Sequence, residues 1–145
     1  MPYTNNRNGI YVTNGSAGTI AHGVPAVNSG IAGIAIKQKS NTWSAGLAAA
    51  NQIAASEVYL LQTHGEIQIG TASGEAGNGT SWAVGDKVYL AAAATASGVT
   101  TFAASTTNTG TFMGRVTETP SSPAINSTYR VPANKVRVDL DLKAV

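Results

Sequence analysis

Near its end the chain contains a segment in which apolar and polar side chains alternate strictly. Residues 135–143 read KVRVDLDLK, so valines and leucines fall on one side and charged residues on the other. A period of two predicts a strand with one buried and one solvated face, which is typical of antiparallel sheets. Residues 57–69 (EVYLLQTHGEIQI) predict another half-buried strand or a tight pair of strands, in which Gly65 marks a bulge or a close backbone approach.

Shorter apolar runs elsewhere are separated by turn-forming residues. Residues 18–37 predict a hairpin, because Asn28-Ser29-Gly30 is a turn signal between two short apolar runs. Pro25 lacks a backbone donor, so it belongs to an edge strand or begins its strand. Further strands are expected at residues 9–13, 82–90 and 111–118, and within 91–111 with turns at 97–98 and 108–110. The total of seven to nine short, mainly antiparallel strands predicts an all-β fold, either a small β-barrel or a sandwich.

One segment favours a helix. Residues 43–55 (WSAGLAAANQIAA) are rich in alanine, and Trp43, Leu47 and Ile53 fall on one stripe at helical spacing. We therefore expect at most one short helix in this chain. The breaker residues of 1–15 predict an extended N-terminal arm, and residues 16–145 are expected to form a single β domain.

The composition excludes several classes of protein. Ala, Gly, Ser, Thr and Asn account for 80 of the 145 residues, and charged residues make up only 11%, against about 25% in an average soluble domain. Disordered chains usually carry a high net charge, whereas the formal charge here is only +2. The sequence also has no cluster of Lys and Arg that would indicate a nucleic-acid-binding surface. The sequence contains no apolar run of about 18 residues, so no membrane-spanning helix is predicted. The polar N-terminus does not resemble a secretory signal, and the absence of cysteine excludes disulfides and thiolate sites.

The residues that carry catalytic chemistry are dispersed. His22 and His64 have no nearby set of acids at metal-ligand spacing, and no Gly-x-Ser-x-Gly pattern marks a serine nucleophile. The glycine-rich residues 74–79 fit neither a dinucleotide fingerprint nor a phosphate-binding loop. The sequence therefore predicts no catalytic, cofactor-binding or metal site, and the protein is not expected to be an enzyme.

The order of motifs along residues 17–142 nevertheless resembles a family of small tailed-phage head proteins. Its most specific part is VGDKVY at residues 84–89, followed by GRV at 114–116. The motifs GTIAHGVPAV, GIAGIAI and VYLLQTHGEIQIG precede these in the same order as in capsid cement, or decoration, proteins. Residues 43–55 and 91–111 are longer than the corresponding parts of the family pattern.

This resemblance implies a structural virion protein made in the host cytoplasm. Such proteins bind the outer surface of the head, commonly as homotrimers at three-fold positions, and stabilise contacts between major capsid protein subunits. An extended arm suits this role because it can add a strand to a partner's sheet edge. We expect the arm contacts at Tyr3, Arg7, Ile10 and Tyr11, unless the arm is simply a frayed terminus. The alternative is another virion β module, a head fibre or tail component that binds a host-surface glycan.

Overall fold

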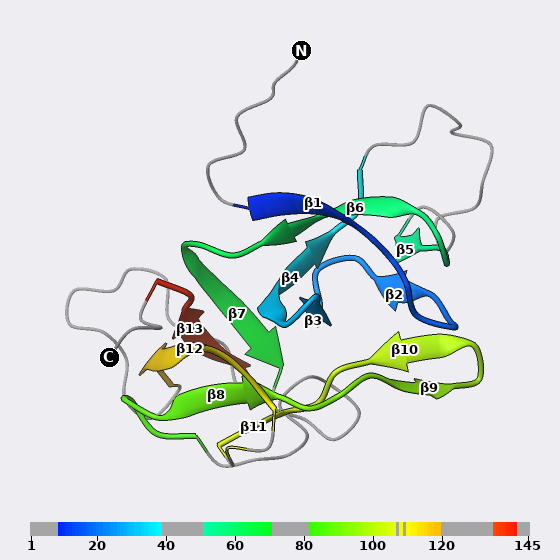
Figure 1. Ribbon diagram of the computed structural model, residues 1–145. Helices are drawn as coiled ribbons and strands as arrows, with labels where there is room; N and C mark the ends of the chain where they lie inside the picture. The colour runs from blue at the N-terminus through cyan, green and yellow to red at the C-terminus, as the bar shows by residue number, and fades with distance from the viewer. Residues whose placement is uncertain are drawn as a thin grey trace.

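The computed structural model describes residues 9–38, 51–70, 82–106, 108, 110–119 and 135–141. These residues form thirteen strands and no helix (Figure 1), and every strand pairing among them is antiparallel. The expected all-β class is therefore confirmed. The strands are β1 (Gly9–Thr13), β2 (Ile20–Ala21), β3 (Pro25–Asn28), β4 (Ile31–Ile36), β5 (Gln52–Ile53), β6 (Val58–Gln62), β7 (Glu66–Gly70), β8 (Lys87–Leu90), β9 (Ala94–Ala96), β10 (Val99–Thr101), β11 (Ala104–Ser105), β12 (Thr111–Glu118) and β13 (Lys135–Asp139).

The number of strands exceeds the expected seven to nine because five of them have only two or three residues. Such short pairs carry too little alternation to be recognised as strands in the sequence. Eight strands have four or more residues, and these form most of the two main sheets.

The first main sheet has the order β1-β6-β4-β3. The predicted hairpin is confirmed: β3 and β4 pair with Ser29 and Gly30 between them, at φ values of 53° and 78°. Two consecutive positive φ angles are typical of the tight turn that matches strand twist. Pro25 begins β3, and β3 is an edge strand, so both options for Pro25 are satisfied.

The second main sheet has the order β11-β8-β12-β13-β7. The strands predicted at 82–90, 111–118 and 135–143 correspond to β8, β12 and β13, with Val136, Val138 and Leu140 buried. Strand β13 ends at Asp139, and residues 142–143 lie outside the described residues. The turn expected at 108–110 does not join neighbouring strands, because β8 lies between β11 and β12.

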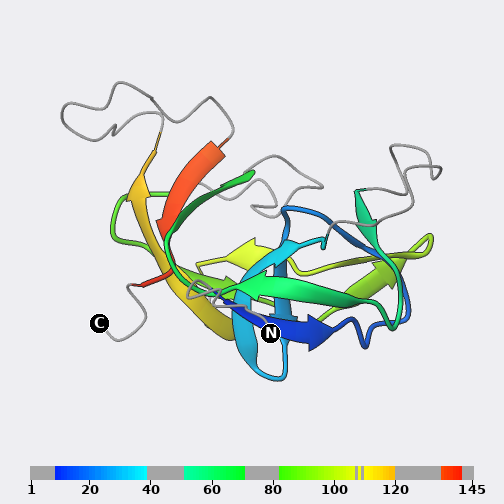
Figure 2. The same ribbon diagram turned by 90° about the horizontal axis from the view of Figure 1, so that it is seen from above.

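A single stretch of chain links the two sheets. The segment 57–69 forms two strands, but they belong to different sheets: β6 lies in the first and β7 in the second. Figure 2 shows β7 curving away from β6 towards β12 and β13. Tyr59, Leu61 and Ile69, from both strands, belong to one buried cluster. That cluster takes side chains from both main sheets and also includes Met113 and Val138, so the architecture is sandwich-like.

Part of the expected helix is a strand. Gln52 and Ile53 form β5, which pairs with Ile20 and Ala21 of β2, and Ile53 is fully buried. The helix over 43–55 is therefore wrong for its last residues, because tertiary packing of Ile53 outweighs the alanine-rich propensity. Residues 39–50 lie outside the described part. No described helix is long and apolar enough to cross a membrane.

The predicted hairpin at Ser97-Gly98 is present as β9 and β10. It packs beside β2 through two backbone hydrogen bonds: Thr19 N–H donates to Gly98 O (2.9 Å), and Thr100 N–H donates to Thr19 O (2.8 Å). This contact brings residues 91–105 to the first half of the chain.

Candidate edge and pocket site

Strand β1 places two of the four predicted contact residues at the edge of the first sheet. The expected arm of residues 1–15 is paired structure from Gly9 onward, because β1 pairs with β6 along its whole length. Ile10 and Tyr11 are 39% and 52% exposed, on opposite faces of the strand. Val12 packs against the core and holds β1 to the domain. Tyr3 and Arg7 lie outside the described residues.

Alternate residues of β1 direct their backbone N–H and C=O groups outward at this edge. Asn14 N–H donates inward to Glu57 O (2.9 Å), whereas Thr13 O points away from β6 and accepts from Asn28 Nδ2 (2.8 Å). Because backbone groups alternate in direction along an antiparallel strand, the outward-facing residues are Gly9, Tyr11 and Thr13. Tyr11 is therefore central to the edge.

The two edge strands of the first sheet approach each other at one end. Asn28 of β3 donates from Nδ2 both to Thr13 O of β1 and, at 3.4 Å, to the Tyr59 hydroxyl. The Asn28 Oδ1 atom accepts from the Ser29 hydroxyl at 3.1 Å. The sheet is thus strongly curled, and one amide side chain bridges its edges. Burial raises the pKa of Tyr59 above its usual 10.0, and the Asn28 hydrogen bond partly offsets that rise.

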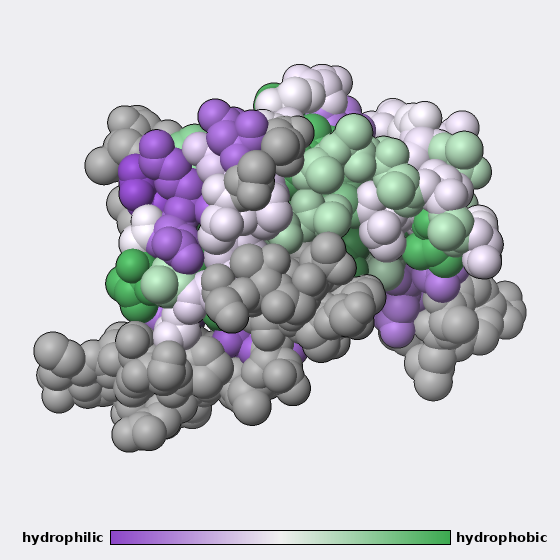
Figure 3. Space-filling view, turned by 90° about the horizontal axis from the view of Figure 1, so that it is seen from below, coloured by the Kyte–Doolittle hydropathy of each residue, from purple (hydrophilic) through white to green (hydrophobic). Residues whose placement is uncertain are grey.

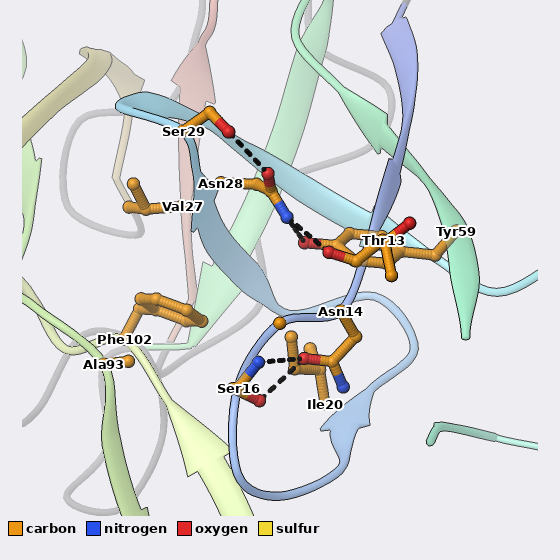
Figure 4. A pocket seen from close by; sticks show the side chains of 11 residues that line it. Thr13, Asn14, Ser16, Ile20, Val27, Asn28, Ser29, Tyr59, Ala93 and Phe102 are labelled. Carbon is orange, nitrogen blue, oxygen red and sulfur yellow. Dashed lines mark hydrogen bonds between the residues drawn. The ribbon is translucent and has the colours of Figure 1, made fainter. Parts of the chain in front are cut away.

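A pocket of about 320 Å³ lies beside this bridge (Figure 4). Its lining includes the polar residues Thr13, Asn14, Ser16, Asn28, Ser29 and Tyr59. Its apolar lining comes from Ile20, Val27, Ala93 and Phe102. The walls therefore combine neutral hydrogen-bonding groups with aliphatic and aromatic carbon.

Asn14 fixes the loop that forms one wall of the pocket. Its side chain is buried, and Nδ2 lies 3.0–3.1 Å from three carbonyl oxygens, those of Gly18, Ile53 and Ala54. Its Oδ1 accepts from Ser16 N–H (3.0 Å) and from the Ser16 hydroxyl (2.7 Å). Such an amide has nearly every hydrogen-bonding position occupied, so it acts as a rigid support rather than as a free ligand group.

Both described histidines and the Lys37–Glu57 pair lie outside the lining of this pocket. His64 Nδ1 lies 2.9 Å from Asp141 Oδ1 in an exposed pair, and His22 Nδ1 accepts from Lys37 N–H at 3.0 Å. Lys37 Nζ donates to Glu57 Oε1 at 3.0 Å. Among the described residues, no group of three or more acids and histidines could hold a metal ion.

Comparisons with protein-family models, with curated proteins and with solved structures found no match. The edge strand, the pocket and the composition of the surface are therefore the features on which a function can be based.

The sequence did not indicate the pocket. Asn14 and Asn28 lie in turn-forming stretches of an Asn-rich chain, and their roles depend on segments far away in the sequence. The one available signal was Asn28 in a hairpin turn, because asparagine there often bonds to backbone. Ile10 and Tyr11 were predicted as contacts of an extended arm, and the structure places both on the edge strand β1.

Proposed function

We propose that this chain is a structural virion protein, a capsid cement protein that binds the outer surface of a phage head and stabilises contacts between major capsid protein subunits. The observation that carries the proposal is the edge strand β1. It has no charged residue, it exposes Ile10 and Tyr11, and among the described residues no strand pairs with its outer edge, where the Thr13 carbonyl bonds to the Asn28 side chain. Exposed strand edges are natural sites for adding a strand from another protein.

The low charge of the surface supports an assembly role. The stretch of residues 92–99 is exposed and consists only of Ala, Thr, Ser, Gly and Val. Figure 3 shows weakly hydrophobic residues gathered across the middle of one face, with strongly hydrophilic residues mainly towards one side. Closing a neighbouring protein over such a surface requires few ions to be desolvated, which lowers the free-energy cost of contact.

The test is binding to expanded phage heads, measured by co-sedimentation. The wild-type protein should sediment with heads and raise the temperature at which they rupture. A double substitution of Ile10→Ser and Tyr11→Ser should weaken binding about tenfold or more, since each loss of about 1.4 kcal/mol of contact energy is tenfold in affinity. The matched control is Val84→Ser, which alters a 53% exposed side chain in the turn before β8.

Two outcomes would contradict the proposal: wild-type protein that does not sediment with any head preparation, or a double variant that binds as well as the control. Truncations should remove residues 1–8 only. A cut beyond Gly9 removes β1 and exposes β6, so loss of binding would then report loss of structure.

A second candidate function is glycan binding by a head fibre or tail component. It is favoured by the pocket, which is lined by polar residues without formal charge and by Phe102, because neutral sugars need hydrogen-bond partners together with apolar ring faces. Ser29→Trp would introduce a bulky side chain at a residue that lines this pocket. If wild-type protein retains bacterial surface polysaccharide on a column and the Ser29→Trp variant does not, the glycan function is favoured over the cement function.

A further inference from the structure

Asn14 is followed by glycine, the neighbour that most readily allows an asparagine side chain to react with its own backbone. In this reaction the backbone nitrogen of the next residue attacks the side-chain amide carbon. Glycine favours the attack because it has no Cβ to block the approach and because its backbone adopts unusual conformations easily. The chain contains two further Asn-Gly pairs, but Asn8 and Asn78 lie outside the described residues.

The bonds made and broken at such a pair follow from its atoms. A bond forms between the Gly15 nitrogen and the Asn14 Cγ atom, the Cγ–Nδ2 bond breaks, and ammonia leaves. The Gly15 nitrogen loses its proton, and the departing Nδ2 gains one. Water then opens the cyclic imide at one of its two carbonyl groups, which leaves aspartate or isoaspartate at position 14. Water is the only co-reactant.

The folded structure obstructs this reaction at the leaving group. Asn14 is 1% exposed, and its Nδ2 atom lies 3.0–3.1 Å from the carbonyl oxygens of Gly18, Ile53 and Ala54. The departing nitrogen must gain a proton, but the carbonyl oxygens around it have none to donate. Burial also keeps solvent away from this atom. The amide is therefore held in a state from which ammonia cannot leave.

The opposite side of the same amide favours attack. Its Oδ1 atom accepts from Ser16 N–H at 3.0 Å and from the Ser16 hydroxyl at 2.7 Å (Figure 4). Two donors on a carbonyl oxygen stabilise the negative charge that develops there when a nucleophile adds to the carbon. Addition without departure of the nitrogen is reversible, so the folded site returns to the amide. The pair becomes reactive once Nδ2 is released to water.

We propose that Asn14–Gly15 is a deamidation site that folding keeps closed and that makes prolonged unfolding irreversible. Unfolding frees Nδ2 from its three carbonyl partners, so ammonia can leave. The product cannot restore the native contacts, because a carboxylate only accepts hydrogen bonds and would face three carbonyl oxygens. Isoaspartate also inserts an extra methylene group into the main chain just after β1.

A chain that stays unfolded long enough to react is thereby removed from the folding equilibrium. This inference concerns the chain itself and does not depend on binding to a phage head, so each of the two proposals can fail without the other.

The first test compares the reaction in folded and unfolded protein. Samples are incubated at neutral pH with and without denaturing guanidinium chloride, and peptide mapping by mass spectrometry follows the amide-to-acid exchange. Asn14 should react about a hundredfold more slowly in the folded protein, or slower still, because only the rare opened form reacts. Asn8 and Asn78, which also precede glycine, calibrate the rate in denaturant. Equal rates at Asn14 in both samples would overturn the proposal.

The second test asks whether the reaction at Asn14 is what prevents refolding. Protein is held in denaturant for increasing times and then diluted, and circular dichroism measures the fraction that refolds. For the wild type, this fraction should fall at the rate of Asn14 conversion.

Gly15→Ala is the matched control, because a Cβ there meets nothing within 4 Å, the backbone φ is not positive, and the added methyl group hinders the attack. This variant should retain its refolding yield over a period in which the wild type loses most of its own, although Asn8 and Asn78 still react. Equal losses in the two proteins would overturn the proposal.

Asn14→Asp reproduces the simpler product directly and does not depend on refolding yields. Its urea midpoint should lie well below that of the wild type, or the variant should not fold at all. The control Asn108→Asp introduces the same charge at an exposed residue and should keep the wild-type midpoint. If the two variants unfold at the same urea concentration, the fold tolerates the product, and unfolding does not become irreversible through Asn14.

Discussion

Asn14 shows how much of this fold depends on single polar side chains in a chain with few charges. Its amide connects three parts of the molecule: the end of β1, the loop leading to Gly18, and the segment that contains β5. Its backbone adds two further bonds, to Glu57 O and from Ser56 N–H. A chain with small side chains has little apolar area with which to fix loops, so buried hydrogen bonds carry more of that task.

Replacing Asn14 with alanine should lower the free energy of unfolding by about 3 kcal/mol, because buried carbonyl groups lose their donor. Urea denaturation with unchanged slope would measure this. Ser16→Ala, which removes one hydroxyl at the rim of the same loop, is the matched control and should cost about 1 kcal/mol. Similar losses for the two variants would show that Asn14 has no special role.

Glu57 makes the stability depend on pH. Burial alone raises its pKa, but the Ala54 N–H and the Lys37 ammonium outweigh that effect and hold the pKa below its usual 4.5. The folded state therefore binds fewer protons than the unfolded state near this pH. The stabilisation is complete above the unfolded pKa and is lost as the pH falls through the folded pKa.

In the Glu57→Gln variant, the urea midpoint should accordingly decrease less as the pH falls from 5 to the pKa of Glu57 in the folded state. Lys37→Gln should flatten it too, since the cation that favours the charged carboxylate is removed. Midpoints measured across this pH range provide the comparison. A Glu57→Gln variant with the full wild-type pH slope would show that other carboxylates account for the acid sensitivity.

At the scale of elements, β6 needs glycine on both sides. A Cβ at Gly9 of β1 would lie 2.2 Å from Leu61 O, and one at Gly33 of β4 would lie 2.1 Å from Gln62 O. Both close contacts are with the end of β6, just before the chain leaves for β7. The glycines allow neighbouring strands to stay close where β6 ends.

Gly33→Ala should therefore destabilise the fold by about 3 kcal/mol, since a backbone atom of β6 must shift to relieve the overlap. Gly15→Ala is the matched control, because nothing lies within 4 Å of the added methyl group. Thermal unfolding of the two variants would separate them by several degrees. If the Gly33→Ala variant unfolds at the same temperature as the Gly15→Ala variant, the close packing of β4 on β6 is not required.

Elements defined by local chemistry could be predicted, and those defined by distant partners could not. The Asn28-Ser29-Gly30 turn and the strand at residues 135–139 are determined by the residues within them. Both elements are present in the structure. Residues 57–69 do not reveal that their two strands enter different sheets, because that depends on pairing with β1 and β13. The strand Gln52–Ile53 was missed for the same reason.

For the candidate site the division is similar. The strand that contains Ile10 and Tyr11 could be predicted, because the short apolar run of residues 9–13 is visible in the sequence. The pocket could not, since Phe102, Tyr59 and Ser16 come together only through the contact of the β9–β10 hairpin with β2 and the curl of the first sheet. All four predicted contacts remain predictions, and two of them, Tyr3 and Arg7, also lie outside the described residues.

At the scale of the whole molecule, the two sheets should unfold together. They share one buried cluster, which contains Leu61 from the first sheet and Leu90 from the second. Leu61→Ala and Leu90→Ala should each lower stability by about 3 kcal/mol and shift one common transition. Calorimetry and circular dichroism would check this. A second transition in either variant would show that the sheets are independent units.

The uninterrupted pairing of β1 with β6 has a mechanical consequence. Tension applied at Gly9 along the strand would strain all the hydrogen bonds between β1 and β6 at once, since β1 can slide past β6 only if they break together. Tension applied across the strand would open the pairs one after another. A molecule that holds its neighbours through β1 would therefore resist stretching of the surface beneath it far better than lifting away from that surface.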